Sequence, residues 1–192
     1  MSELKKELKA LLDTFDRKVA NWEWSDMVKW LRTVHSLLVN VSNVAVPCKY
    51  TLAKRLTQCL NPNLPQGPHY VTLNILQRIF ELCAQHHEHY KENLALFSAG
   101  LFPFFQYASP ENKELVLVLV KDYFLPLGPQ ISFALPGLVC AFCPSLIEVG
   151  NAALETKIKQ YYTDSSQDED VGVKGFVSDL SQETFLQLSL EI

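Results

Sequence analysis

Two short clusters in the sequence combine side-chain types and spacings that could support chemistry. Cys140-Ala141-Phe142-Cys143 is a C-x-x-C pair, the spacing found in zinc sites and in dithiol redox sites. His86 and His89 lie one helical turn apart in the run HHEHY, where two imidazoles could share a metal ion. The catalytic hypothesis that these residues allow is a metal- or thiol-dependent enzyme.

The rest of the sequence does not support either cluster as a catalytic centre. A zinc ribbon needs a second cysteine pair, a thioredoxin-type site needs a βαβ setting, and no third metal ligand can be named. The motifs H-E-x-x-H, G-x-S-x-G, Walker A and G-x-G-x-x-G are all missing. We therefore predict that the protein is not an enzyme and has no metal or cofactor. We interpret Cys140 and Cys143 as buried thiols of a core helix, and the histidines as a solvated helix junction.

A group of cations is the more informative signal. Lys49, Lys54 and Arg55 lie on one predicted helix that begins at Pro47. On that helix Lys54 and Arg55 are about 100° apart, and Lys49 lies within roughly 140° of Lys54. They form a loose basic face, which is either the solvated side of an amphipathic helix or a site for phosphate or lipid headgroups.

Composition and charge limit the class of protein. With 192 residues, 48% of them hydrophobic and 20% charged, the chain is expected to fold as one ordered domain. Residues 1–60 carry ten Lys/Arg against six Asp/Glu, whereas residues 163–192 carry one against seven. The excess of Lys and Arg in residues 1–60 favours an anionic partner, but the net charge of −4 for the whole chain argues against a nucleic-acid binder.

The first residues and the cysteine count predict a cellular compartment. Charged residues alternate with apolar residues throughout MSELKKELKALLDTF. This stretch therefore lacks the uninterrupted apolar core of a signal peptide. The five cysteines are an odd number, so reduced thiols are expected rather than a disulfide framework. We expect a cytoplasmic protein.

One long span without charged residues, 123–147, needs a separate explanation. Its length would cross a bilayer, but four prolines and two glycines interrupt it. We favour a buried core helix between corners over a transmembrane segment. The three tryptophans Trp22, Trp24 and Trp30 could form a ligand platform, and aromatic residues at a helix-to-helix turn favour the core instead.

Helix start signals recur at a nearly constant interval. They fall near residues 3, 25, 47, 68, 88, 110, 129 and 151, about 19 to 22 residues apart. Two helices per roughly 40 residues is the period of HEAT and armadillo arrays. We predict an all-α fold, an α-solenoid of about eight helices in HEAT/armadillo-like pairs, with an up-and-down bundle as the alternative. The run ELVLVLVKDYF could also be a buried strand, but no other segment offers it a partner.

The predicted repeats divide the chain into a folded part and a tail. The helical-repeat domain covers residues 1–162, and the polar, acidic segment 163–192 is expected to be flexible. The proline-rich stretch in KRLTQCLNPNLPQGPHY then turns one repeat helix into the next.

Four stretches carry a resemblance to a known family. VPCKYTLAKRLTQCLNPNLPQGPH at 46–69 is followed by LALFSAGLFPFFQYA at 94–108, YFLPLG at 123–128 and LPGLVCAFCPSLIEVG at 135–150. In this order and spacing they resemble the N-terminal region of the Dopey family of large cytoplasmic trafficking proteins, over about residues 10 to 162. Dopey proteins are far longer and have leucine-zipper-like C-terminal repeats that are absent here. We expect a fragment, a short paralogue or a truncated gene model.

The resemblance implies a function and a location. It implies a non-catalytic scaffold or adaptor in vesicle-mediated transport between endosomes and Golgi, peripheral on those membranes. The implied partners are a large scaffold related to Arf exchange factors and, in animals, kinesin light chain, and the family is also linked to an aminophospholipid flippase. The family's N-terminal region is associated with phosphatidylinositol 4-phosphate, and we place that phosphoinositide on Lys49, Lys54 and Arg55 as our own hypothesis. The alternative is a soluble helical-repeat module that binds only proteins.

Overall fold

The computed structural model describes residues 3–19, 22–40, 46–85 and 89–144, together with residues 147, 150, 152 and 156. The chain divides into two compact units, Met1–Ser145 and Leu146–Ile192. The described residues contain helices and turns and no strand. The predicted all-α class is therefore confirmed, and the alternative of a strand at ELVLVLVKDYF is excluded.

Only four residues of the second unit are described. They are helical and exposed, and the Thr156 hydroxyl donates a hydrogen bond to the carbonyl oxygen of Ala152 at 2.9 Å. The remainder of the helix predicted from residue 151 lies outside the described residues. The predicted boundary at residue 162 and the predicted acidic tail 163–192 also lie there, and they stay predictions.

The first unit is a succession of helices joined by short turns. Their bounds are α1 Glu3–Lys18, α2 Trp24–Val39, α3 Lys49–Cys59, α4 Gln66–Gln85, α5 Tyr90–Ser98, α6 Leu101–Phe105, α7 Pro110–Leu119, the π-helical turn η2 Val120–Phe124, the 3-10 segment η3 Leu125–Phe133 and the helix Leu135–Pro144. The predicted starts near 3, 25, 47, 68, 88 and 110 agree with these helices to within a few residues.

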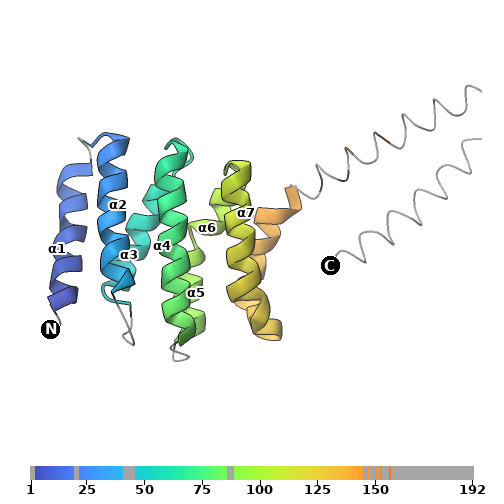
Figure 1. Ribbon diagram of the computed structural model, residues 1–192. Coiled ribbons are helices and arrows are strands. Elements are labelled where there is room, and N and C mark those ends of the chain that lie inside the picture. The colour runs from blue at the N-terminus through green and yellow to red at the C-terminus, as the bar shows by residue number, and fades with distance from the viewer. Residues whose placement is uncertain are drawn as a thin grey trace, which may run out of the picture. The chain divides into compact units, whose positions relative to one another are not determined.

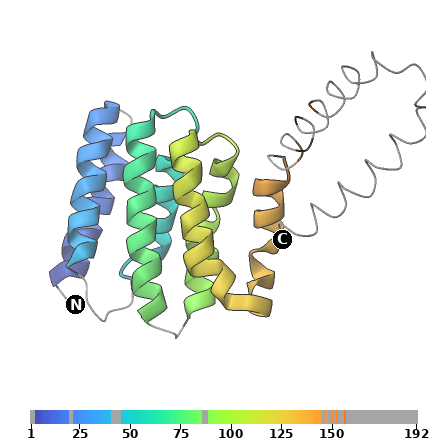
Figure 2. The same cartoon turned by 45° about the vertical axis from the view of Figure 1, so that its right-hand side comes forward.

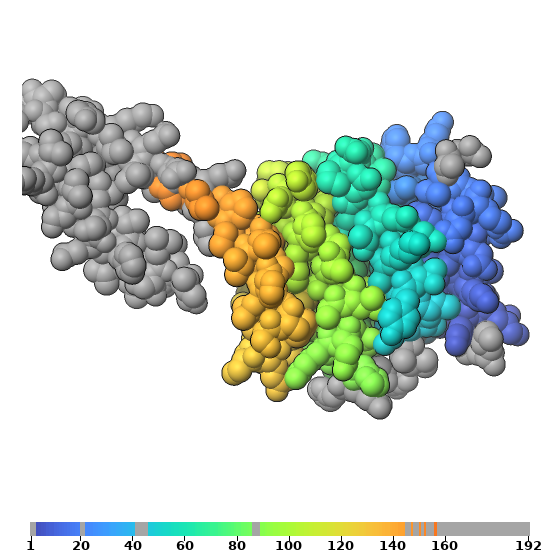
Figure 3. All heavy atoms as spheres, turned by 180° about the vertical axis from the view of Figure 1, so that it is seen from behind, coloured from blue at the N-terminus to red at the C-terminus, as the bar shows by residue number. Residues whose placement is uncertain are grey.

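The helices of the first unit stack in two layers (Figures 1 and 2). α1, α3 and α5 form one layer and α2, α4 and α7 form the other, and each helix contacts the next of its layer. Consecutive helices also pair across the layers, as α1 does with α2 and α3 with α4. This stacking is compatible with the predicted HEAT/armadillo-like solenoid. Figure 3 shows the face on which α3 lies between α1 and α5.

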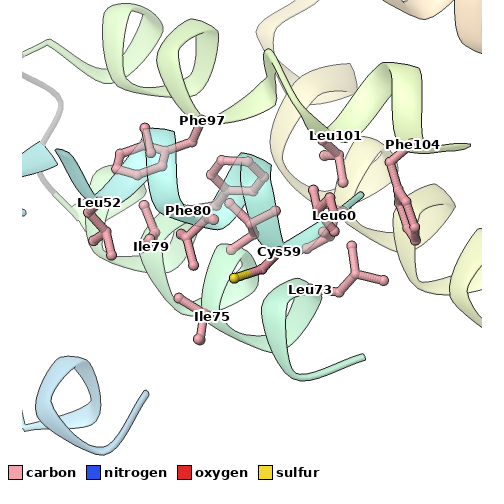
Figure 4. Packing of buried hydrophobic residues seen from close by; sticks show 14 of the residues in the cluster. Leu52, Cys59, Leu60, Leu73, Ile75, Ile79, Phe80, Phe97, Leu101 and Phe104 are labelled. Atoms are coloured by element: carbon pink, nitrogen blue, oxygen red, sulfur yellow. The ribbon is translucent and has the colours of Figure 1, made fainter. Parts of the chain in front are cut away.

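The core lies between the two layers. Figure 4 shows apolar side chains of α3, α4, α5 and α6 meeting there, among them Leu52, Ile79, Phe80 and Phe97. These four residues are at most 2% exposed. A neighbouring cluster joins α1 to α2, where Trp30 packs against Phe15 with ring centroids 4.7 Å apart. Helices with one apolar stripe therefore bury that stripe against the opposite layer.

The proline-rich corner between α3 and α4 forms as predicted. The side-chain Oδ1 of Asn61 accepts a hydrogen bond from the backbone N–H of Asn63 at 2.9 Å, an Asx turn. His69 Nε2 lies 2.8 Å from the Asn61 carbonyl oxygen, which ties α4 to the corner. Pro68 lies in the first turn of α4, where a missing backbone donor costs nothing. This stretch is a structural corner.

The uncharged span 123–147 differs from the prediction of one buried core helix. η3 has no buried residue. Its helical path is interrupted at Gly128, whose φ of 54° is positive and not helical. Pro136 then lies in the first turn of the separate helix Leu135–Pro144. The short helix α6 was not predicted from the sequence, because Pro103 lies inside it.

The run Pro110–Phe133 is long and apolar enough to cross a membrane by length and composition. Its mean hydropathy is 1.2 in the most apolar window, and 22% of that window is buried in the first unit. Core helices of globular proteins meet the same criterion. The break at Gly128, with Pro126 and Pro129 beside it, argues against a continuous span.

Candidate functional site

The three predicted phosphoinositide ligands on α3 do not share one face. Lys54 is exposed, Lys49 is half-buried, and Arg55 is buried with 9% of its surface exposed. The loose basic face expected from helical spacing is therefore not present in this geometry. The lipid-binding role stays a prediction, and among these three residues only Lys54 presents its charge freely to solvent.

Arg55 holds α3 against α1. Its Nη2 pairs with the carboxylate of Asp16, and its Nη1 donates a hydrogen bond to Gln58 Oε1 at 2.8 Å. The guanidinium carbon lies 5.4 Å from the ring centroid of Phe15, a cation–π contact. A guanidinium with these partners is committed to internal packing: it is itself buried, it covers the buried ring of Phe15, and it pairs with a carboxylate at the edge of the core whose side chain is 47% exposed.

Arg55 also lies at a recognisable position in the sequence. The buried stripe of α3 includes Leu52, Leu56 and Cys59, and Arg55 is three residues from the first and four from the last. The same spacing that predicts a core residue therefore applied to this arginine. Helical spacing therefore indicates a buried position for Arg55, whereas its charge indicates an exposed one.

Lys49 connects α3 to α5. Its Nζ donates a hydrogen bond to Asn93 Oδ1 at 3.0 Å and lies 5.5 Å from the ring centroid of Tyr50. Burial raises the pKa of the nearby Cys83 thiol to about 11, against smaller lowering effects of Asn93 and Lys49. Lys49 therefore has a structural contact of its own.

One exposed pair on α3 was not anticipated. Tyr50 is 72% exposed and lies one helical turn before Lys54, which is also exposed. An aromatic ring next to a cation on the same helical face is typical of contacts at a membrane–water interface. The signal for this pair in the sequence is the i, i+4 spacing of an aromatic residue and a lysine.

The tryptophans separate into core and surface. Trp30 is 5% exposed and donates from Nε1 to the Leu11 carbonyl oxygen at 2.9 Å. Trp22 is half-buried with its ring centroid 6.1 Å from that of Trp30, whereas Trp24 is 60% exposed. The prediction that aromatic residues at this turn are core is confirmed for Trp30 and wrong for Trp24.

A groove between α2 and α4 was also not anticipated. It has a volume of about 500 Å³ and is lined by His35, Val39, Asn74, Gln77, Arg78 and Glu81. Arg78 donates to the carbonyl oxygens of Leu38 and Val39 at 3.3 Å and to Glu81 at 3.1 Å, which fixes one wall. A cation at these carbonyls also complements the dipole of α2. The groove is a fixed, polar surface on the layer that contains α2, α4 and α7.

The two clusters considered for catalysis take different positions. His86 lies outside the described residues, and His89 Nδ1 lies 3.6 Å from Glu92 at the start of α5. The expectation that Cys140 and Cys143 are buried is wrong, because both thiols are exposed on the helix Leu135–Pro144. In the described ranges no three His, Cys, Asp or Glu side chains are grouped closely enough to bind a metal ion.

The two-layer stack of helices places this protein in the all-α class, and its arrangement is compatible with an α-helical repeat module. Comparison with known families narrows the class further. The sequence profile described as Dopey, N-terminal, matches residues 1–170. The chain therefore belongs to the Dopey family, as the four stretches quoted above indicated.

Curated relatives occur in animals and fungi. The chain is 35% identical over 118 residues to Protein pad-1 of Caenorhabditis elegans, covering 61% of this chain and 5% of that protein. It is 31% identical over 127 residues to Protein DOP1B of Xenopus laevis, covering 66% of this chain and 6% of that protein. It is 32% identical over 131 residues to Protein DOP1 of Saccharomyces cerevisiae, covering 60% of this chain and 8% of that protein. The aligned part is thus less than a tenth of each relative, and no solved structure matches the chain.

Proposed function

We propose that this chain is a non-catalytic scaffold module in transport between endosomes and Golgi, acting at the cytoplasmic surface of those membranes. The observation that supports this most is the Dopey family match over residues 1–170, which coincides with a stack of helices in the described residues. Stacked helices offer extended surfaces for other proteins. The partners we propose are a large scaffold related to Arf exchange factors and, in animals, kinesin light chain.

The groove between α2 and α4 is the surface we propose for protein contact. Asn74 and Gln77 each carry an amide with one acceptor and two donors, which matches the peptide groups of an extended chain. Arg78 and Glu81 offer opposite charges beside these amides. A groove whose wall is already fixed by hydrogen bonds loses little conformational entropy when a partner binds.

Association with the Arf-exchange-factor-related scaffold tests this proposal. The purified native chain is compared with Asn74→Ala/Gln77→Ala and with a control, Thr33→Ala, whose exposed side chain lies on α2 outside the groove lining. We expect the native chain and the control to bind equally and the double variant to bind about tenfold more weakly. Equal binding of all three would exclude the groove, and no binding of the native chain would exclude this partner.

A second candidate function is direct contact with phosphatidylinositol 4-phosphate. The observation that favours it is the exposed pair of Tyr50 and Lys54 on α3. Lysine attracts the headgroup phosphate, and an interfacial tyrosine adds apolar contact with the lipid surface. The test below uses Tyr50 and Lys54 and leaves Arg55 unchanged, because Arg55 is buried and paired with Asp16.

Flotation with liposomes, with and without phosphatidylinositol 4-phosphate, tests the lipid contact. The test variant is Tyr50→Ser/Lys54→Glu, and the control is Lys121→Glu, an exposed lysine on η2. We expect the native chain and the control to float selectively with the phosphoinositide and the double variant to remain in solution, in a salt-dependent manner. If the double variant floats like the native chain, α3 is not the membrane contact.

A further inference from the structure

The cysteines of the described residues differ sharply in accessibility. Cys140 and Cys143 are exposed, Cys48 is half-buried, and Cys59 and Cys83 are buried. Burial raises the pKa of the Cys59 thiol to about 12 and that of Cys83 to about 11. Because the thiolate is the nucleophile, the two buried thiols are protected from reaction. Thiol chemistry in this part of the chain is therefore concentrated on the exposed pair.

Cys140 forms part of the wall of a hollow between α6 and the helix Leu135–Pro144. The hollow has a volume of about 190 Å³ and is lined by Phe102, Pro103, Gln106, Tyr107, Gly137, Cys140 and Ala141. Apart from Gln106 and the thiol itself, these residues present mainly carbon to it. Cys140 is thus an exposed cysteine that also borders a small, mainly apolar hollow.

The local backbone explains why this hollow exists. Gln106 Nε2 donates to the Cys140 carbonyl oxygen at 2.8 Å and holds the helix Leu135–Pro144 against α6. At Gly137 an added Cβ would lie 2.4 Å from the ring of Phe102, so only glycine permits this close approach. The cavity is a fixed feature of the contact between these two helices.

The stretch of chain that carries the exposed thiols is uncharged and presents apolar side chains to solvent. Leu135 is 47% exposed and Val139 is 54% exposed on the same helix, and Leu125 in η3 is 60% exposed. No Asp, Glu, Lys or Arg occurs from Tyr123 to Ile147. A hydrocarbon chain attached here would meet apolar neighbours such as the ring of Phe142, which packs on Phe105 with ring centroids 4.6 Å apart. Lys113, whose Nζ lies 5.5 Å from the Phe105 ring centroid, is the nearby cation that could meet lipid phosphate groups.

We propose that Cys140 is an S-acylation site whose long-chain acyl group begins in the hollow between α6 and the helix Leu135–Pro144. Cys143, one helical turn further along, is the second acceptor. Two acyl chains give stable membrane anchoring where one gives only marginal binding, which accounts for a pair of thiols. The inference goes beyond the proposed scaffold function, and its test does not depend on partner binding or on flotation.

The reaction is a transfer between thioesters and needs no oxidant or reductant. The cysteine sulfur attacks the carbonyl carbon of a fatty acyl-coenzyme A, and the new carbon–sulfur bond forms as the bond to the coenzyme A sulfur breaks. The proton of the cysteine thiol is balanced by the thiol of free coenzyme A. The product is a protein thioester, which hydroxylamine cleaves.

Metabolic labelling of the full chain tests the site. The chain is expressed in eukaryotic cells supplied with an alkynyl palmitate, and hydroxylamine-sensitive label per molecule is measured. We expect Cys140→Ser to lose most of the label, Cys143→Ser to lose the smaller part, and the double variant to lose all of it. The control Cys48→Ser keeps the native level. Circular dichroism of each variant checks that the exposed substitutions leave the fold intact.

Two results would overturn the proposal: no hydroxylamine-sensitive label on the native chain, or undiminished label on the double variant. The position of the acyl group in the hollow is tested separately, by thermal unfolding of the protein after incubation with palmitoyl-coenzyme A. Acylation in the Cys143→Ser variant, at Cys140, should raise Tm more than acylation in Cys140→Ser; equal shifts would exclude the hollow.

Discussion

Arg55 illustrates how one charged side chain can serve packing instead of recognition. Asp16 on α1, Gln58 on α3 and the ring of Phe15 all contact its guanidinium. Its Nε is buried without a hydrogen-bond partner in the described part of the chain, so the site is not fully satisfied. The ion pair therefore specifies how α1 meets α3, at some cost in desolvation.

Replacing this arginine should weaken the fold measurably. We expect Arg55→Ala to lower the free energy of unfolding by about 2 kcal/mol, because it removes the packing of a buried side chain on Phe15 together with its hydrogen bond to Gln58 and its ion pair with the half-exposed Asp16. Lys54→Ala, one residue earlier and exposed, should change it by less than about 0.5 kcal/mol. Urea titrations followed by circular dichroism compare the two. Equal effects of both substitutions would show that Arg55 does not hold the helices together.

The buried thiols predict a loss of stability in alkali. Burial raises the pKa of the Cys59 thiol to about 12 and that of the Cys83 thiol to about 11, from the ordinary value of 9.0. Above pH 9 the unfolded chain releases these protons while the folded chain keeps them, so stability falls as pH rises, by at most about 1.4 kcal/mol per pH unit and thiol. Urea titrations from pH 7 to 10.5 measure this decline. Cys59→Ala should make it shallower, and an unchanged slope would contradict the assignment.

At the scale of the elements, close approach between helices depends on small residues. Gly100 lies between α5 and α6, and an added Cβ would come within 2.6 Å of Thr57 Oγ1 on α3. The atoms Cγ2 and Cβ of Thr57 would be 2.8 and 2.9 Å away, so rotating the threonine side chain does not remove the clash. α3 therefore lies as close to the α5–α6 junction as a glycine at position 100 allows.

Gly100→Ala should force α3 away from the α5–α6 junction. We expect a destabilisation of about 1 to 3 kcal/mol, the usual cost of overpacking. Thr57→Ala removes two of the three contacting atoms, so the double variant should be more stable than the sum of the single effects predicts. A double-mutant cycle from urea titrations measures this coupling. Additive effects would show that the clash is absorbed elsewhere.

The sequence predicted the long helices well because their apolar stripes and start signals agree. α1, α2, α3, α4 and α7 each combine a stripe with a start signal, such as Ser109-Pro110 before α7. The short α6 and the 3-10 segment η3 lack that agreement, since prolines fall inside both. Helical spacing also leaves open which face meets a neighbour. The burial of Arg55 and the groove lined by Asn74 and Gln77 depend on neighbouring helices and could not be predicted from one helix alone.

At the scale of the whole molecule, the position at which the folded unit ends determines its stability. The first unit ends at Ser145, whereas the sequence predicts a helical-repeat domain that extends to residue 162. The buried apolar residues of the described part all lie between Leu8 and Ala141. Because the stability of a repeat stack is approximately a sum over neighbouring contacts, the boundary determines how much of it a shorter chain retains.

Truncation measures that boundary directly. We expect residues 1–145 to fold cooperatively, with a free energy of unfolding within about 0.5 kcal/mol of the full chain, because the described core lies inside this range. Residues 1–162 serve as the matched comparison, and urea titrations of all three chains provide the measurement. A gain of more than about 1 kcal/mol for 1–162 over 1–145 would favour the predicted eighth helix as part of the same stack. Failure of 1–145 to fold would contradict the division at Ser145.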